Sequence, residues 1–281
     1  MQMVDRKQEL TSGEIQVATL DIFKKFIEIC NSQELHYYVA YGSLIGVVRH
    51  QGFIPWDDDL DIWMPRPDYN KLLQYFDNAR HDTGSLVALH PSEDNLIPFL
   101  ITRVSDTRYK QIGEYGDEIP QMGTFIDIYP LDGLRGNQDE ALKENEDTYS
   151  LTMKYVHALN SDSFDRSAGQ LKRILKKVRA AMMKSPAYYW RELCKRATVE
   201  EYEQAEYVSC KIWNDDNSCK VIDKKSDFGE GKLATFEGLQ VRIPDNADAI
   251  LQRIYGNYMK LPPEEERVGH HFYSIVSRGQ K

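Results

Sequence analysis

Long apolar runs are absent from this chain. No uninterrupted stretch approaches the roughly 18 residues that a helix needs to cross a bilayer, so the sequence predicts no transmembrane segment. Residues 1–7 also lack the apolar core of a signal peptide, and we expect none. The four cysteines are scattered and form no C-x-x-C pair, which disfavours a structural zinc site and predicts free thiols in a reducing compartment. We therefore expect a cytoplasmic protein.

A basic excess is also lacking. The chain has 44 acidic residues against 35 basic ones and a net charge of −9, whereas proteins that bind nucleic acid usually carry a basic face. We therefore expect no nucleic-acid partner. The pattern G-x-x-x-x-G-K-[ST] is missing as well, which disfavours an ATP-hydrolysing P-loop enzyme. With 281 residues, 41% of them hydrophobic and 28% charged, the chain is long enough and ordinary enough for a globular enzyme.

The most informative feature that is present is an acidic run, in which four aspartates fall within residues 57–61. Carboxylates this close repel one another, and near an apolar core they are costly unless a cation neutralises them. Asp59 and Asp61 share one face if this segment is a strand. Asp57 joins them if the strand begins early, and Asp58 then points the other way. Such a face suits Mg²⁺ or Mn²⁺ held against substrate phosphates.

An acidic run is more often a solvated loop, but the flanks of this one favour a strand. Its apolar neighbours alternate with the carboxylates, as on a strand with one polar face: Phe53, Ile54, Trp56, Leu60, Ile62 and Trp63. A calcium loop of the EF-hand type fits poorly, because Ile62 stands where that loop needs glycine and Asp68 where it needs glutamate.

Two further motifs carry polar groups that suit the same chemistry. A β-prone stretch over 37–41 ends at Gly42-Ser43 and leads into helix-forming residues, an order that presents backbone N–H groups and a hydroxyl to a phosphate. Ser43 can equally be a plain N-cap. Asp127 stands alone in the apolar segment 123–130 and needs a partner. It either pairs with an arginine or is a third carboxylate that ligates the metal or takes a proton from an attacking hydroxyl.

Three basic residues are candidates for contacts with a donor phosphate. Arg49 follows the Gly-Ser segment, Arg103 lies on an expected strand, and Lys232 precedes the segment Phe236-Glu237-Gly238. The alternative for each is a structural ion pair. His270 and His271 can be substrate contacts, although a histidine pair in a polar tail is more often a surface feature.

Taken together, these motifs resemble those of a known family. A Gly-Ser turn, an Asp-x-Asp strand and a later aspartate on a strand are similar to the nucleotidyltransferase superfamily. More narrowly, residues 41–62, YGSLIGVVRHQGFIPWDDDLDI, resemble the signature of the LicD family. That family comprises bacterial phosphocholine transferases and resembles the fukutin-related ribitol-phosphate transferases. Segments 125–132, 236–244 and 255–263 are also similar, so the resemblance spans about residues 30–272.

The resemblance implies a mixed α/β fold, in which a nucleotidyltransferase-like sheet is flanked by helices. It implies transfer of a phospho-alcohol from a CDP-activated donor to a sugar hydroxyl of a cell-surface glycan, such as a lipopolysaccharide or teichoic acid, with release of CMP. CDP-choline is the preferred donor, ahead of CDP-ribitol and CDP-glycerol. The catalytic residues, which hold Mg²⁺ or Mn²⁺, are then Asp59, Asp61 and Asp127. The substrate-binding residues are Gly42, Ser43, Arg49, Asp57, Arg103 and Lys232.

The chain is expected to have three regions. A catalytic core covers 1–137, a mainly helical insertion covers 138–213, and residues 214–281 complete the core and the substrate site. Expected helices cover about 11–35, opened by a Thr11–Glu14 capping box, and 43–50, 67–80 and 246–258. Beside the acidic run, expected strands lie near 37–41, 86–90, 98–104, 124–129, 219–223 and 233–243, before a polar tail.

The expected insertion contains a basic stretch between Lys172 and Lys184. Such a stretch is usually a solvated helix face. The functional alternative is peripheral contact with an anionic lipid surface or a polyanionic acceptor. A lipid-linked acceptor would bring the protein to the inner face of the cell membrane.

Two rival functions stay open at this point. One is a nucleotidyltransferase that passes NMP from an NTP to a small molecule, which releases pyrophosphate instead of CMP. The other is a non-catalytic module that binds carbohydrate or metal, which turns over no nucleotide donor.

Overall fold

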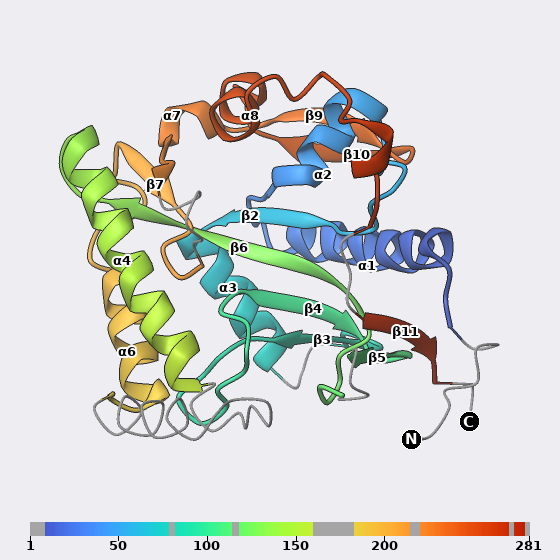
Figure 1. Cartoon of the computed structure of the whole chain (residues 1–281), viewed down its shortest axis with the longest axis horizontal. Helices are drawn as coiled ribbons and strands as arrows, with labels where there is room; N and C mark the ends of the chain where they lie inside the picture. The colour runs from blue at the N-terminus through green and yellow to red at the C-terminus, as the bar shows by residue number, and fades with distance from the viewer. Residues whose placement is uncertain are drawn as a thin grey trace. The chain divides into compact units, whose positions relative to one another are not determined.

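The structure, a computed structural model, describes residues 9–78, 82–113, 118–159, 183–213, 220–269 and 273–278 (Figure 1). The chain divides into two compact units. The first is drawn from 1–89, 102–129 and 226–281, and the second from 90–101 and 130–225. The predicted histidine pair at 270–271 and most of the basic stretch before Lys184 lie outside the described residues.

The first unit is built on a sheet with the strand order β1-β2-β6-β4-β3. The bounds are β1 (Tyr38–Val39), β2 (Asp61–Pro65), β3 (Leu86–Leu89), β4 (Thr102–Asp106) and β6 (Thr124–Leu134). β1 pairs antiparallel with β2, and β4 pairs antiparallel with both β3 and β6. Helices accompany this sheet, so the mixed α/β class predicted from the sequence is confirmed.

Helix α1 (Ser12–Ser32) begins where the sequence predicts it. The side chain of Thr11 accepts a hydrogen bond from the N–H of Glu14, and the Glu14 carboxylate accepts one from the N–H of Thr11, which satisfies two of the donors that a helix start leaves open. The buried face of α1 carries Phe23, whose ring centroid lies 6.1 Å from that of Phe236. Phe236 in turn lies 4.9 Å from Phe53, just before the acidic run. An aromatic core thus supports the start of that run.

The remaining elements of the first unit have the bounds α2 (Tyr41–Ile45), the π-helix η2 (Gly46–His50), α3 (Arg66–Asp77), β5 (Tyr109–Gly113), β9 (Lys232–Phe236), β10 (Leu239–Ile243), α8 (Ala247–Tyr255), η4 (Glu264–Glu266) and β11 (Tyr273–Ser277). Helix α7 (Lys225–Phe228) covers the residues at which the chain passes from the second unit to the first.

Two expectations for the C-terminal region were wrong. The stretch expected as one strand near 233–243 is the hairpin β9–β10, because Glu237 and Gly238 take positive φ angles of 48° and 78° and turn the chain back. The expected polar tail contains β11, which pairs antiparallel with β5 and buries Ile275 at 1% exposure. This strand is short, and its partner lies far away in the sequence, so the local pattern does not reveal it.

The second unit contains the helices α4 (Gln138–Leu159) and α6 (Pro186–Ala197), which pack against each other (Figure 1). Tyr155 and Leu193, both 0% exposed, lie in the core of this unit. The end of β6 pairs here with β7 (Tyr207–Ser209), and β7 pairs with β8 (Asp223–Lys224). None of the helices in the described part of the chain is long and apolar enough to cross a bilayer.

Candidate active site

Most of the acidic run precedes strand β2, and only its last aspartate, Asp61, lies on that strand. β2 begins only at Asp61, because the N–H of Asp57 donates to the carbonyl of Ile54 (2.9 Å) and turns the chain before the strand. The strand does not reach back to Asp59 or Asp57, so the condition under which they share a strand face with Asp61, and Asp58 points away, is not met. Carboxylate oxygens of Asp57, Asp58 and Asp59 lie within 4.8 Å of one another.

Ser43 fixes the backbone at the end of the run. Its hydroxyl accepts a hydrogen bond from the N–H of Asp61 (2.9 Å) and lies 3.3 Å from the carbonyl oxygen of Asp59, to which it donates. One side chain thus bonds two backbone groups that a neighbouring strand would otherwise satisfy. The alternative role of Ser43 as an N-cap is wrong, because the N-cap of α2 is Ala40. Phosphate binding by Ser43 stays a prediction.

The turn between Ser43 and the acidic run depends on close backbone approach. After α2 the chain continues as the wider π-helix η2, a form that is frequent at functional sites. A Cβ atom at Gly46 would lie 2.5 Å from the carbonyl oxygen of Gly52, so only glycine fits there. The Cβ position of Gly42 lies 3.6 Å from the Oδ2 atom of Asp57, which brings the Gly-Ser segment beside the carboxylates.

Asp61 is the electrostatic centre of the site. Burial raises the pKa of its carboxyl well above the usual range, and the negative charges of Asp59, Asp127 and Asp57 raise it further. A hydrogen bond with Tyr129 opposes this shift in the pKa of Asp61. The three aspartates predicted to be catalytic therefore interact with one another, although they come from two separate parts of the sequence.

Asp127 has a fixed basic partner. It lies directly opposite Arg103 in the β4–β6 pair, and the Nε atom of Arg103 lies 2.9 Å from the Asp127 Oδ1 atom. The Arg103 guanidinium also lies over the ring of Phe125, 4.3 Å from its centroid. This is the structural ion pair that the sequence left open, and it places a cation beside the acidic site. A phosphate contact by Arg103 stays a prediction.

Tyr273 of β11 also faces the site. Burial raises the pKa of its phenol, and the nearby charges of Asp59 and Asp58 raise it further. The phenol therefore stays protonated and can donate a hydrogen bond to an oxygen atom in the site.

The carboxylate set fits a hard divalent cation. Ligands on opposite sides of such an ion are about 4–5 Å apart, twice a metal–oxygen distance of roughly 2.0–2.6 Å, and the oxygens of Asp57, Asp58 and Asp59 lie within 4.8 Å of one another. All these donors are carboxylate oxygens, which suit Mg²⁺ or Mn²⁺ better than softer metals. Burial and the neighbouring negative charges both raise the pKa of Asp61, and a cation would neutralise those charges.

The other two basic candidates donate hydrogen bonds to backbone carbonyls. The Nη1 atom of Arg49 donates to the carbonyl of Tyr258 (2.6 Å), and its Nε atom donates to His50 (2.9 Å). Lys232 donates to the carbonyl of Asp245 (3.0 Å) from an exposed position. Their roles in binding substrate stay predictions.

The sequence analysis missed Tyr129 and Tyr273. Tyr129 lies two residues after Asp127, so the two-residue period of a strand places both on the same face of β6 and would have found it. No local signal points to Tyr273, because it joins the site through the long-range pairing of β11 with β5.

The chain is similar to known proteins over much of its length. Residues 34–167 match the family model described as the LicD/FKTN/FKRP nucleotidyltransferase domain. The chain is 25% identical over 266 residues to the lipopolysaccharide cholinephosphotransferase LicD of Haemophilus influenzae, and the match covers 94% of this chain and 97% of that protein. An uncharacterised protein of Rickettsia prowazekii is 37% identical over 68 residues, which cover 24% of this chain and 26% of that protein.

Proposed function

We propose that this chain is a phosphotransferase of the LicD family and that it transfers phosphocholine from CDP-choline to a sugar hydroxyl of a cell-surface glycan, releasing CMP. The observation that carries this proposal is the convergence of Asp57, Asp59, Asp61 and Asp127, which raises the pKa of Asp61 through burial and through the charge of the other three. A site with this much uncompensated negative charge suits a divalent cation that neutralises donor phosphates.

In this proposal, Asp59 and Asp61 would hold Mg²⁺ or Mn²⁺, and Asp57 and Asp58, whose carboxylate oxygens lie within 4.8 Å of that of Asp59, could join the ligand set. The bound cation would supply charge neutralisation at the donor pyrophosphate. The acceptor hydroxyl attacks the phosphorus that carries choline, and the bond from that phosphorus to the bridging oxygen breaks, so that CMP leaves. Asp127 either ligates the cation or takes the proton of the hydroxyl, and its contact with Arg103 (2.9 Å) holds the carboxylate in place.

The uncharged groups of the site have orienting roles. The Ser43 hydroxyl fixes the backbone between Asp59 and Asp61. The protonated phenol of Tyr273 can donate to a phosphate oxygen.

Choline is preferred as the alcohol because aromatic rings attract a quaternary ammonium, and several lie beside the acidic site. The ring centroid of Tyr41 lies 4.9 Å from that of Tyr129 and 4.7 Å from that of Trp63, which is itself buried. Tyr41 also has a φ angle of 45°, a conformation that is uncommon for a bulky residue and that clusters at functional sites. Trp56 is a weaker candidate, because Arg267 already lies over its ring.

We infer a cytoplasmic reaction, at the inner face of the cell membrane where the acceptor is lipid-linked. The scattered spacing of the four cysteines supports this, because it predicts thiols in a reducing compartment.

Product analysis tests the reaction. The protein is incubated with Mg²⁺, a lipopolysaccharide acceptor and CDP-choline, CDP-ribitol or CTP, and the nucleotide products are separated by chromatography. We expect CMP from CDP-choline, and no CMP in excess chelator. Pyrophosphate from CTP would instead support the nucleotidyltransferase. Turnover of no donor would support a binding module. Faster release of CMP from CDP-ribitol would overturn the choline assignment alone.

A further inference from the structure

The second unit contains a pocket of about 570 Å³ that the proposed reaction does not use. The pocket lies where the end of β6, the start of α4 and the end of α6 meet. Its charged lining consists of Arg135, Glu140, Lys143, Glu144, Asp147 and Arg196. A volume in this range is typical of sites for small molecules.

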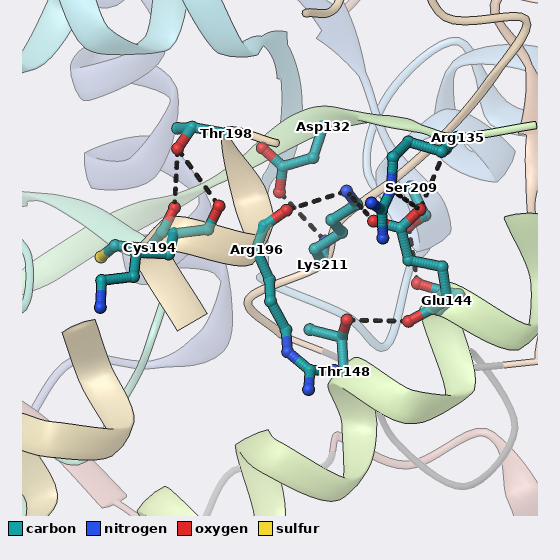
Figure 2. Close-up of polar contacts among 11 residues, drawn as sticks. Asp132, Arg135, Glu144, Thr148, Cys194, Arg196, Thr198, Ser209 and Lys211 are labelled. Carbon is teal, nitrogen blue, oxygen red and sulfur yellow. Dashed lines mark hydrogen bonds and ion pairs between the residues drawn. The ribbon is translucent and has the colours of Figure 1, made fainter. Parts of the chain in front are cut away.

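One wall of the pocket is rigidly built around a buried lysine (Figure 2). Lys211 is 0% exposed, and its Nζ atom donates to the Glu144 Oε1 atom (2.8 Å) and to the backbone carbonyl of Arg196 (2.9 Å). Its backbone N–H donates to the buried carboxylate of Asp132 (3.2 Å). Lys211 thus fixes the end of α6 through the backbone of Arg196, while the Arg196 side chain points away from it (Figure 2).

The carboxylate in this wall is already matched by two cations. Glu144 accepts hydrogen bonds from Lys211 and from the Nε and backbone N–H of Arg135. Burial opposes its ionisation, but these bonds outweigh burial and lower the pKa of Glu144. Glu144 therefore has little charge left to offer a cationic ligand.

Two cations of the lining have no such match. Within the residues that the structure describes, neither Lys143 nor Arg196 forms an ion pair. The lining carries three cations (Arg135, Lys143 and Arg196) and three carboxylates (Glu140, Glu144 and Asp147). One of these carboxylates, Glu144, is already neutralised by Lys211, which lies outside the lining.

We propose that this pocket binds an anionic saccharide, that is, a sugar that carries a phosphate or carboxylate group. The planar guanidinium of Arg196 can hold such a group with two parallel hydrogen bonds, and Lys143 adds a second charge. Asp147 and Glu140 accept hydrogen bonds from sugar hydroxyls. That this sugar belongs to the glycan acceptor rests on the proposed function, whereas the binding itself does not.

The test is calorimetric titration of the full chain, in chelator and at low salt, with three sugars of similar size: glucose 6-phosphate, galacturonate and glucose. We expect the two charged sugars to bind and glucose to bind at least about tenfold more weakly, the scale of a lost charge-assisted hydrogen bond. If glucose 6-phosphate binds tighter than galacturonate, the anionic group of the preferred sugar is a phosphate. The reverse order identifies it as a carboxylate.

Variants locate the site. Arg196→Gln should weaken binding of the charged sugar about tenfold or more, and the fold should survive because only the backbone of Arg196 contacts Lys211. Lys195→Gln is the matched control, since Lys195 pairs with Glu192 and does not line the pocket. Any one of three results would overturn the proposal. Neither charged sugar binds at millimolar concentration, glucose binds as tightly as they do, or both variants lose affinity equally. The titrations contain no nucleotide donor and no metal. Their outcome is therefore independent of whether the protein releases CMP from CDP-choline, which is tested separately.

Discussion

The acidic site of the first unit and the Lys211 network of the second unit both remove charge from water, but they do so in opposite ways. Asp61 is surrounded by like charges, and its pKa is raised. Glu144 is surrounded by opposite charges, and its pKa is lowered. A matched buried charge is costly to break, because removing one partner leaves the other uncompensated. Buried charges left in mutual repulsion are destabilising until a ligand relieves them. The comparison therefore separates a functional site from a structural one.

The largest expected effect comes from removing the repelling charges. Asp59→Asn or Asp61→Asn should lower the rate of CMP release by at least about 100-fold, the scale seen on losing one electrostatic contact in a preorganised site. In chelator, the same variants should unfold at the same or a higher urea concentration than the parent, because repulsion is relieved. A rate close to that of the parent would contradict the assigned role of these residues, and a large loss of stability would make their role structural.

In the Lys211 network the same kind of substitution should act on stability. Lys211→Met removes the cation that bonds Glu144 and the carbonyl of Arg196, and should lower the free energy of unfolding by about 3 kcal/mol, the low end for a broken buried pair because Arg135 still contacts Glu144. Lys195→Met, which breaks an exposed pair, should change it by less than about 1 kcal/mol. Urea denaturation measures both. Equal effects of the two variants would remove the distinction between the regions.

The two regions also differ in how far the sequence predicts them. The sequence singles out Asp59, Asp61 and Asp127 by their residue type and apolar neighbours, because a carboxylate among apolar residues needs a compensating partner. The hairpin and β11 are not found, because positive φ angles at Glu237 and long-range pairing leave little local trace. Lys211 gives no signal at all, since a lone lysine is usually exposed and its partners Glu144 and Arg196 come from distant helices.

A smaller effect is expected where an uncharged group supports the acidic site. Ser43→Ala leaves the N–H of Asp61 without the hydroxyl that accepts its hydrogen bond, which should destabilise the protein by about 1–2 kcal/mol. CMP release should fall more than stability explains, because Asp59 and Asp61 lose their common anchor. Ser43→Thr keeps the hydroxyl and is the control. If Ser43→Ala changed stability alone, Ser43 would be a structural residue.

The smallest effect, and the sharpest form of the comparison, is the dependence of stability on pH in metal-free protein. The pKa of Glu144 is lower in the folded state than its ordinary value of 4.5, so its contribution is present above that pH and is lost as pH falls through the folded pKa. The pKa of Asp61 is raised in the folded state, so it favours folding at low pH, and this contribution is lost as pH rises towards the folded pKa. Relative to Glu144→Gln, the parent should therefore lose stability as the medium is acidified from pH 5. Relative to Asp61→Asn, it should lose stability as pH rises from 4. Urea denaturation across this range, in chelator, gives both differences, and slopes of the same sign would contradict the opposite electrostatics of the two regions.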